Sequence, residues 1–270
     1  MRASPRTLEV VDAGADDRFR LWVRELFPDS HEWEERYVEH EMSHVGPMLT
    51  AGLFDLEGAS VLEFGCHTGA TAIVLAHHGA EVTAVDVNSG LLELAALNAQ
   101  RYGVSSLIQF RLLTAGQRLP FADAVFGAIT CNSVLEYVAR PHLALVLDEL
   151  DRVLRPGGFL LVFGTSNALW PIEVHSRRWL VNYVPVALDR WLPRPIQRGV
   201  SPWRLRRRFA SYRNVMLREG AAAYISAKRA MGLRGWKVAA LRIITVLGRP
   251  LGVTPGILTP SMTLLLRKPG

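Results

Sequence analysis

The chain has 270 residues, 49% hydrophobic and 21% charged with a net charge of +6, enough for one large or two small globular domains. This composition excludes a disordered or collagen-like chain, and two cysteines, Cys66 and Cys131, are too few for a disulfide framework. No apolar run approaches the ~18 residues of a membrane-spanning helix, and the N-terminus lacks the apolar segment of a signal peptide, so we expect a soluble, cytoplasmic protein.

The first 58 residues, rich in Trp, Glu and His, predict a helical N-terminal extension that could act as a lid. From residue 59, short apolar runs alternate with longer amphipathic ones. The expected strands are 59–64, 80–87, 107–113, 124–130 and 159–164, and the expected helices are 70–79, 88–103 and 142–154. This alternation is typical of βαβ units in a parallel sheet covered on both faces, so the predicted fold class is α/β, doubly wound.

Beyond residue 164 the alternation is less regular. Residues 201–212 predict a helix with Pro202 at its first position, and 213–219 and 261–268 predict strands. Two irregular inserts remain, roughly 165–200 and 220–260. The expected organisation is therefore an extension (1–58), a Rossmann-like core (59–164) and substrate-side inserts with the last helix and strands (165–270).

The chemistry-bearing motif follows the first predicted strand, where residues 63–69 read Glu-Phe-Gly-Cys-His-Thr-Gly. Glycines at this point let the backbone approach a ligand closely, and the helix that follows offers free N–H groups. Asp86 ends the second predicted strand, where its carboxylate could accept the hydroxyls of a ribose. Since His67 breaks the dinucleotide pattern G-x-G-x-x-G, these residues predict a site for a different nucleoside cofactor.

The pattern E-x-G-x-x-x-G with an acid at the end of the next strand resembles class I S-adenosylmethionine-dependent methyltransferases. Residues 118–138 resemble that family's fourth-strand segment, and 147–162 its helix, Pro-Gly-Gly turn and fifth strand. The resemblance covers residues 59–164 strongly and the final strands more weakly. It implies a mostly parallel seven-stranded sheet, S-adenosylmethionine as cofactor, and methyl transfer as the activity.

The resemblance also implies roles for individual positions. The segment bordering the methionine moiety and ribose comprises Glu63, Gly65, Cys66, His67 and Gly69. Asp86 is expected to hold the ribose hydroxyls and Val87 to pack on the adenine. The adenine edge is expected to meet Ala115, Gly116 and Gln117, and the reactive methyl to lie near Cys131, Asn132 and Ser133. Two thiols without a matching His/Cys cluster predict no metal site.

Three positions depart from the family pattern. His67 replaces the central glycine of the loop, Ala115 stands where relatives often carry Asp, and Tyr137 where many have His. The first two motivate an alternative from another class: a catalytically inactive cofactor-binding or scaffold protein.

The acceptor is expected to be a small molecule, glycan or lipid-like metabolite, most readily methylated on oxygen, which requires a general base. His175 is the first candidate for that base and Glu173 the second polar participant, although a surface histidine paired with Glu173 would give the same sequence. Further candidate acceptor contacts are Tyr37, His44, Tyr137, Trp170, Trp179 and Tyr183.

Charge is distributed unevenly: residues 1–170 carry 12 Arg against 22 acids, whereas 171–270 carry 19 Lys and Arg against three acids. The C-terminal region is thus expected to meet an anionic substrate, a membrane surface, nucleic acid or the acidic part of the same chain. The basic stretch 227–248 could lie on a membrane, as a peripheral lipid methyltransferase would require, or pack on the sheet. Residues 204–209 could bind phosphates or form a solvated face. Without a nucleic-acid-binding appendage, nucleic acid is the least favoured partner.

Overall fold

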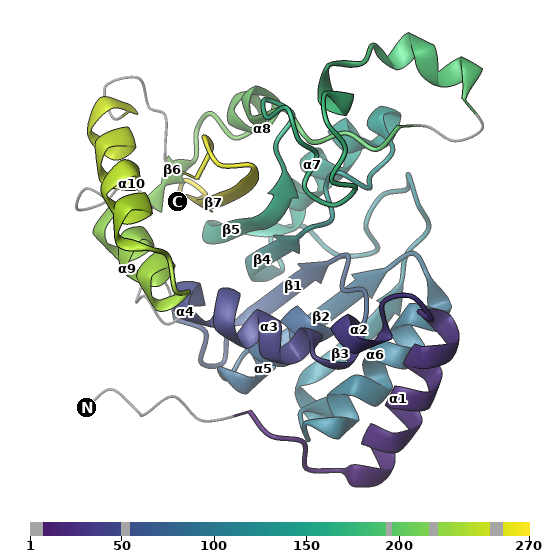
Figure 1. The fold of residues 1–270 in the computed structure, drawn as a ribbon. Coiled ribbons are helices and arrows are strands. Elements are labelled where there is room, and N and C mark those ends of the chain that lie inside the picture. The colour runs from purple at the N-terminus through teal and green to yellow at the C-terminus, as the bar shows by residue number, and fades with distance from the viewer. Residues whose placement is uncertain (1–7, 50–54, 193–195, 216–220, 249–255) are drawn as a thin grey trace. The chain divides into compact units, whose positions relative to one another are not determined.

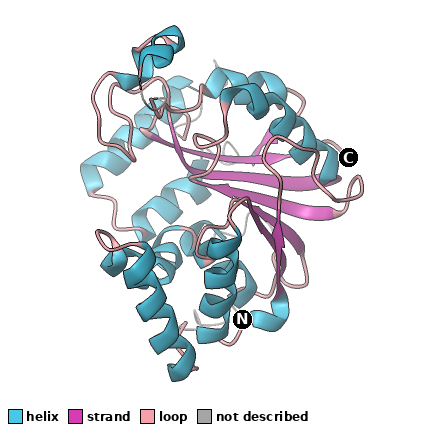
Figure 2. Ribbon diagram, turned by 90° about the vertical axis from the view of Figure 1, so that its right-hand side faces the viewer, coloured by secondary structure: helices cyan, strands magenta, loops and turns pink. Residues whose placement is uncertain are grey.

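The computed structural model describes residues 8–49, 55–192, 196–215, 221–248 and 256–270. The chain divides into two compact units at the Ala115–Gly116 junction, here called the first and second units. Helices flank the strands of both units (Figure 2). None of the described helices is long and apolar enough to cross a membrane.

In the first unit, three parallel strands lie in the order β3-β2-β1: β1 (Ser60–Phe64), β2 (Glu81–Asp86) and β3 (Ile108–Leu112). They are connected by α5 (Ala70–His77), α6 (Ser89–Arg101) and the short 3-10 turn Ser105–Leu107. The Asn88 side chain caps α6 by accepting a hydrogen bond from the Leu91 backbone N–H at 3.2 Å. The expected strand–helix alternation is confirmed throughout this segment.

The N-terminal segment is helical where it is described: α1 (Ala13–Leu26), α2 (His31–Glu35), α3 (Tyr37–His44) and α4 (Gly46–Leu49). Helix α1 lies along α6 (Figure 1), with Phe19 and Val23 packed against Leu94 in a fully buried cluster. Beside this cluster Arg101 is buried over the Phe19 ring and pairs with Asp16. Apolar packing and a buried ion pair therefore hold α1 against α6.

In the second unit, β4 (Phe126–Asn132) pairs in parallel with β5 (Leu154–Ser166). Strand β7 (Ser261–Arg267) is antiparallel to β5, and β6 (Arg213–Asn214) is antiparallel to β7, in the order β4-β5-β7-β6. Helix α7 (Arg140–Val153) precedes β5, and α8 (Pro202–Arg208) begins on the expected proline. The described residues thus form seven mostly parallel strands with intervening helices, and the predicted α/β, doubly wound class is confirmed.

Two expectations for the second unit were wrong. Strand β5 begins at Leu154, not at residue 159. Its pairing register with β4 shifts between Phe126 and Ala128, and Gly157 has φ +75°. The Pro-Gly-Gly segment is therefore a bulge inside the strand, not a turn before it. The second insert is also not irregular, since it forms α9 (Ala222–Ala230) and α10 (Gly235–Gly248). Of the expected strand 213–219, residues 216–219 lie outside the described residues.

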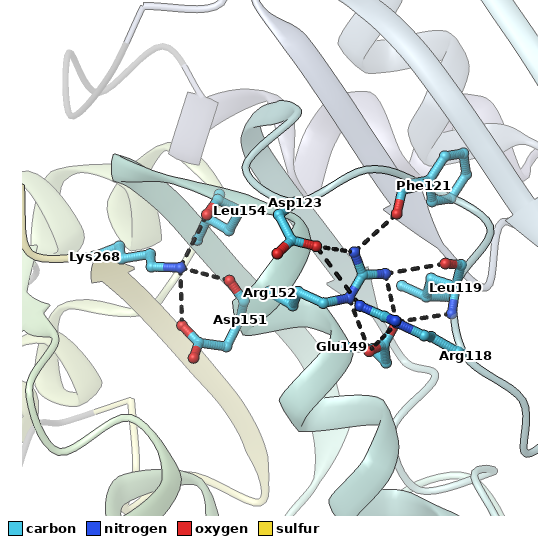
Figure 3. Close-up of polar contacts among 9 residues, drawn as sticks. All are labelled: Arg118, Leu119, Phe121, Asp123, Glu149, Asp151, Arg152, Leu154 and Lys268. Carbon is cyan, nitrogen blue, oxygen red and sulfur yellow. Dashed lines mark hydrogen bonds and ion pairs between the residues drawn. The ribbon is translucent and has the colours of Figure 1, made fainter.

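Basic residues of the C-terminal region pair with acids of α7. Lys268 Nζ lies 3.2 Å from Asp151 Oδ1 (Figure 3), and Arg208 pairs with both Asp148 and Asp151. Nearby, Arg152 joins Glu149 and Asp123. Part of the positive charge after residue 170 is therefore neutralised by acidic residues of the same chain.

Candidate active site

The glycine-rich loop connects β1 to α5 and has the backbone conformation that its sequence predicts. Gly65 and Gly69 adopt φ values of +77° and +79°, in the left-handed region that favours glycine. A Cβ atom at Gly69 would lie 3.0 Å from the Cβ of Ala95, so glycine is needed for the loop to approach α6. The loop thus turns tightly at the carboxyl end of β1, with the Gly65 and Cys66 N–H groups donating to the Val85 carbonyl.

Asp86 is fixed beside this loop by backbone donors. Its Oδ2 accepts a hydrogen bond from the His67 N–H at 3.0 Å, and its Oδ1 accepts from the Val87 and Asn88 N–H groups at 2.8 and 3.1 Å. A carboxylate offers about four acceptor positions, so Oδ2 retains one for a ligand hydroxyl. The next side chain, Val87, is 59% exposed and offers an apolar surface. These features fit the ribose and adenine of a nucleoside cofactor.

The other first-unit positions differ in exposure. Glu63 and Cys66 are buried, and burial raises the pKa of each well above its usual value, so the thiol is held neutral. His67 is turned toward the N-terminal helices, with Nδ1 3.6 Å from Glu34 Oε2. Ala115 is exposed and ends this unit.

The second unit holds the remaining expected cofactor residues. Gly116 has φ +74° beside the His142 ring, and Gln117 is exposed. At the end of β4, Cys131 is fully buried, whereas Asn132 and Ser133 are partly exposed.

His175 is paired with a carboxylate that the sequence did not single out. Its Nε2 lies 2.6 Å from Glu136 Oε1, which also accepts the Ser166 N–H at 3.0 Å. The Glu136 side chain is fully buried, and its Oε2 has no hydrogen-bond partner among the described residues. Burial alone would lower the pKa of His175, but the hydrogen bond and charge of Glu136 outweigh it and raise the pKa. The pair is therefore a buried carboxylate orienting a half-buried imidazole.

The alternative in which His175 pairs with Glu173 is not found, because the ring pairs with Glu136. Glu173 is fully buried and accepts backbone N–H groups instead, from His175 at 3.3 Å and from Ser176 at 2.6 Å. Burial acts to raise its pKa, but these hydrogen bonds prevail and lower it. Glu173 thus orders the turn that carries His175. Glu136 could have been noticed in sequence as an ionisable residue three positions after Ser133, just beyond β4.

The aromatic candidates fall into different environments. The Tyr137 ring centroid lies 5.6 Å from that of His175, whereas Trp170 and Tyr183 donate hydrogen bonds to the carbonyls of Leu258 and Leu169. Trp179 is 68% exposed. Tyr37 and His44 belong to α3 of the first unit, where Tyr37 contacts His67 and His44 stacks on His40. Across the described residues, no group of three or more His, Cys, Asp or Glu could hold a metal ion.

The sequence is similar to known methyltransferases over part of its length. The sequence model of the methyltransferase domain family matches residues 62–162. The ubiquinone biosynthesis O-methyltransferase of Xylella fastidiosa (strain 9a5c) is 33% identical over 132 residues, 48% of this chain and 52% of that protein. The protein of the same name from Paracidovorax citrulli is 32% identical over 142 residues, 51% of this chain and 58% of that protein. The chain spans about half the length of the curated relatives it matches.

Two solved structures share the fold at low sequence identity. The YcgJ protein of Bacillus subtilis aligns with a TM-score of 0.50 and 21% identity, covering 84% of this chain and 98% of that one. An S-adenosylmethionine-dependent methyltransferase of Mesorhizobium loti aligns with a TM-score of 0.50 and 16% identity, covering 82% of this chain and 96% of that one. These two matches support the class I fold.

Proposed function

We propose that this chain, whose residues 62–162 match the methyltransferase domain family, transfers a methyl group from S-adenosylmethionine to a hydroxyl of a small-molecule acceptor. The observation that carries the choice of oxygen is the 2.6 Å hydrogen bond between His175 and Glu136, because a hydroxyl acceptor needs a base. The relatives named O-methyltransferases support the same choice.

The first unit is proposed to hold the cofactor. When bound, S-adenosylmethionine supplies a methyl group already activated on a sulfonium, so positioning can account for much of the rate. Asp86 Oδ2 accepts a ribose hydroxyl, Val87 packs on the adenine, and residues 63–69 border the methionine moiety. The proposal keeps residues 115–117 as contacts of the adenine edge and residues 131–133 as neighbours of the methyl group.

The second unit is proposed to activate the acceptor. The neutral His175 ring takes the proton from the acceptor hydroxyl as its oxygen attacks the methyl carbon. The Glu136 carboxylate and the Gly164 carbonyl both favour the protonated ring, so they stabilise the imidazolium that forms. Glu173 positions the turn, and Tyr137, beside the His175 ring, contacts the acceptor.

A transfer assay tests this proposal. We expect phenols and aliphatic alcohols of graded chain length to yield O-methyl ethers when incubated with the protein and methyl-labelled S-adenosylmethionine. A matched amine series should remain unlabelled. If the protein binds S-adenosylhomocysteine but labels no member of either series, the scaffold alternative takes its place.

The acceptor is further proposed to be lipid-like and presented at an anionic membrane surface. The insert that carries the 3-10 turns Val181–Tyr183 and Val186–Trp191 exposes a run of large apolar side chains: Trp179, Leu180, Tyr183, Val186, Leu188, Trp191 and Leu192. Three exposed arginines (177, 178 and 190) lie among them, and the one acid, Asp189, is neutralised by Arg198 at 2.7 Å. An apolar surface with unbalanced positive charge suits a membrane interface.

Vesicle sedimentation distinguishes this insert from α10. We expect the protein to sediment with phosphatidylglycerol vesicles more than with phosphatidylcholine vesicles, less so at high salt. Trp191→Ser should reduce binding, whereas Trp236→Ser, which removes an equally exposed tryptophan from α10, should not. The reverse pattern would move the contact to the basic stretch 227–248, and absence of sedimentation would leave a soluble acceptor.

A further inference from the structure

His67 occupies a backbone conformation that histidine does not favour. Its φ is +49°, in the left-handed region, at the loop position where the resembling family has glycine. A non-glycine residue persists there only where its surroundings compensate for the strain. The contacts of the side chain should therefore show what the histidine contributes.

Those contacts come from the N-terminal helices. The His67 ring lies 5.6 Å from the Phe27 ring and 6.3 Å from the Tyr37 ring, which it meets edge-on. Glu34 Oε2 lies 3.6 Å from His67 Nδ1 and accepts a hydrogen bond from Thr68 Oγ1 at 3.3 Å. Glu34 is buried, and its carboxylate contacts two neighbouring residues of the glycine loop.

A second chain of buried hydrogen bonds ties the same loop to α1. The Thr68 carbonyl accepts from Asn98 Nδ2 at 2.7 Å, and Asn98 Oδ1 accepts from Arg101 Nη1 at 2.7 Å. Arg101 in turn pairs with Asp16 of α1. The loop is thus held by the N-terminal helices on two sides, and only the His67–Glu34 side uses a residue foreign to the family pattern.

We infer that His67 and Glu34 are positioning residues that anchor the N-terminal helices to the glycine loop, so that Phe27, Glu34 and Tyr37 form part of the cofactor site. In this interpretation His67 does not obstruct the site. It gives up the conformational freedom of a glycine and gains contacts with Glu34 of α2 and Tyr37 of α3. This inference rests on the proposed function for its cofactor. Because coupling is reciprocal, a cofactor whose affinity depends on docked helices must stabilise the docking of those helices by the same factor.

The decisive variant is His67→Gly, which restores the family's residue and relieves the backbone conformation. If the histidine were an obstruction, the affinity for S-adenosylhomocysteine would stay the same or rise. If it is an anchor, calorimetry should show the affinity falling about fivefold or more, since each aromatic contact carries a measurable share of the docking energy.

Hydrogen exchange supplies the second measurement. S-adenosylhomocysteine should slow amide exchange over residues 31–44 in the wild type, and His67→Gly and Glu34→Gln should both lose that protection. Glu32→Gln, a change of the same kind at an exposed neighbour on α2, should keep both affinity and protection. If the wild type binds S-adenosylhomocysteine, and His67→Gly and Glu34→Gln keep both its affinity and its protection, the inference is wrong and the proposed function stands. If the wild type does not bind S-adenosylhomocysteine, the proposed function is wrong.

Discussion

Replacing Asp86 with alanine should weaken the binding of S-adenosylhomocysteine by about 10- to 150-fold, because one hydrogen bond to a charged acceptor contributes roughly 1.5–3 kcal/mol. The carboxylate is already oriented by three backbone N–H donors, from His67, Val87 and Asn88. Its remaining acceptor position is therefore fixed before the ligand arrives, and binding costs little reorganisation. Isothermal titration measures the loss directly.

Asp86 also organises a turn, and the control separates that role from ligand binding. Asp55 is a matched carboxylate in the same unit, exposed and accepting the Glu57 N–H at 3.1 Å, so Asp55→Ala should leave the affinity intact. Asp86→Asn keeps an oxygen for the turn but removes the charge, and we expect an intermediate affinity. If Asp86→Ala lowered the melting temperature without changing the affinity, the residue would be a turn-former only.

The parts of the fold that the sequence predicts are those with local causes. Buried runs such as 59–64, the Asn88 cap and the glycine at 69 each act over a few residues, and each is found as expected. The Pro-Gly-Gly segment shows the limit of such local signals. Its turn-forming residues are those of a loop, but they lie within β5 as an irregularity between the Phe126–Leu154 and Ala128–Phe159 pairs, where Gly157 has φ +75°.

The sequence predicted some contacts of the candidate site and missed others, again because it shows local signals but not long-range pairing. Asp86 ends the second strand, which the strand pattern places beside the first, so its position next to the loop was predictable although it lies 19 residues from His67. The partner of His175 is Glu136, 39 residues away, whereas Glu173 was only two residues away and drew the prediction. Likewise, nothing near position 67 indicates that its ring meets Phe27 and Glu34. Long-range pairings of this kind are decided by packing, which a single sequence does not display.

Replacing His175 with glutamine should slow methyl transfer by about 10²–10⁴-fold, the range that a positioned general base contributes. The affinity for S-adenosylhomocysteine should not change, because the residue belongs to the acceptor side. His31→Gln is the matched control: its ring lies on α2 of the first unit, with Nδ1 3.0 Å from the Pro28 carbonyl oxygen. Retained turnover in His175→Gln would remove the histidine from the chemistry.

The pH dependence of turnover then tests whether Glu136 acts through that histidine. A base must be neutral to accept a proton, so turnover should rise as the pH increases through the pKa of His175, which lies above its ordinary value of 6.5. Burial lowers the pKa of His175 and Glu136 raises it. In Glu136→Gln the contribution of the carboxylate charge is lost while that of burial remains, so the pKa of His175 should fall. The rising limb should therefore shift to lower pH in the variant, while the plateau falls because the imidazolium loses its counter-charge. If Glu136 only supported the fold, Glu136→Gln would reduce turnover by the same factor at every pH, and the rising part of the pH profile would not shift.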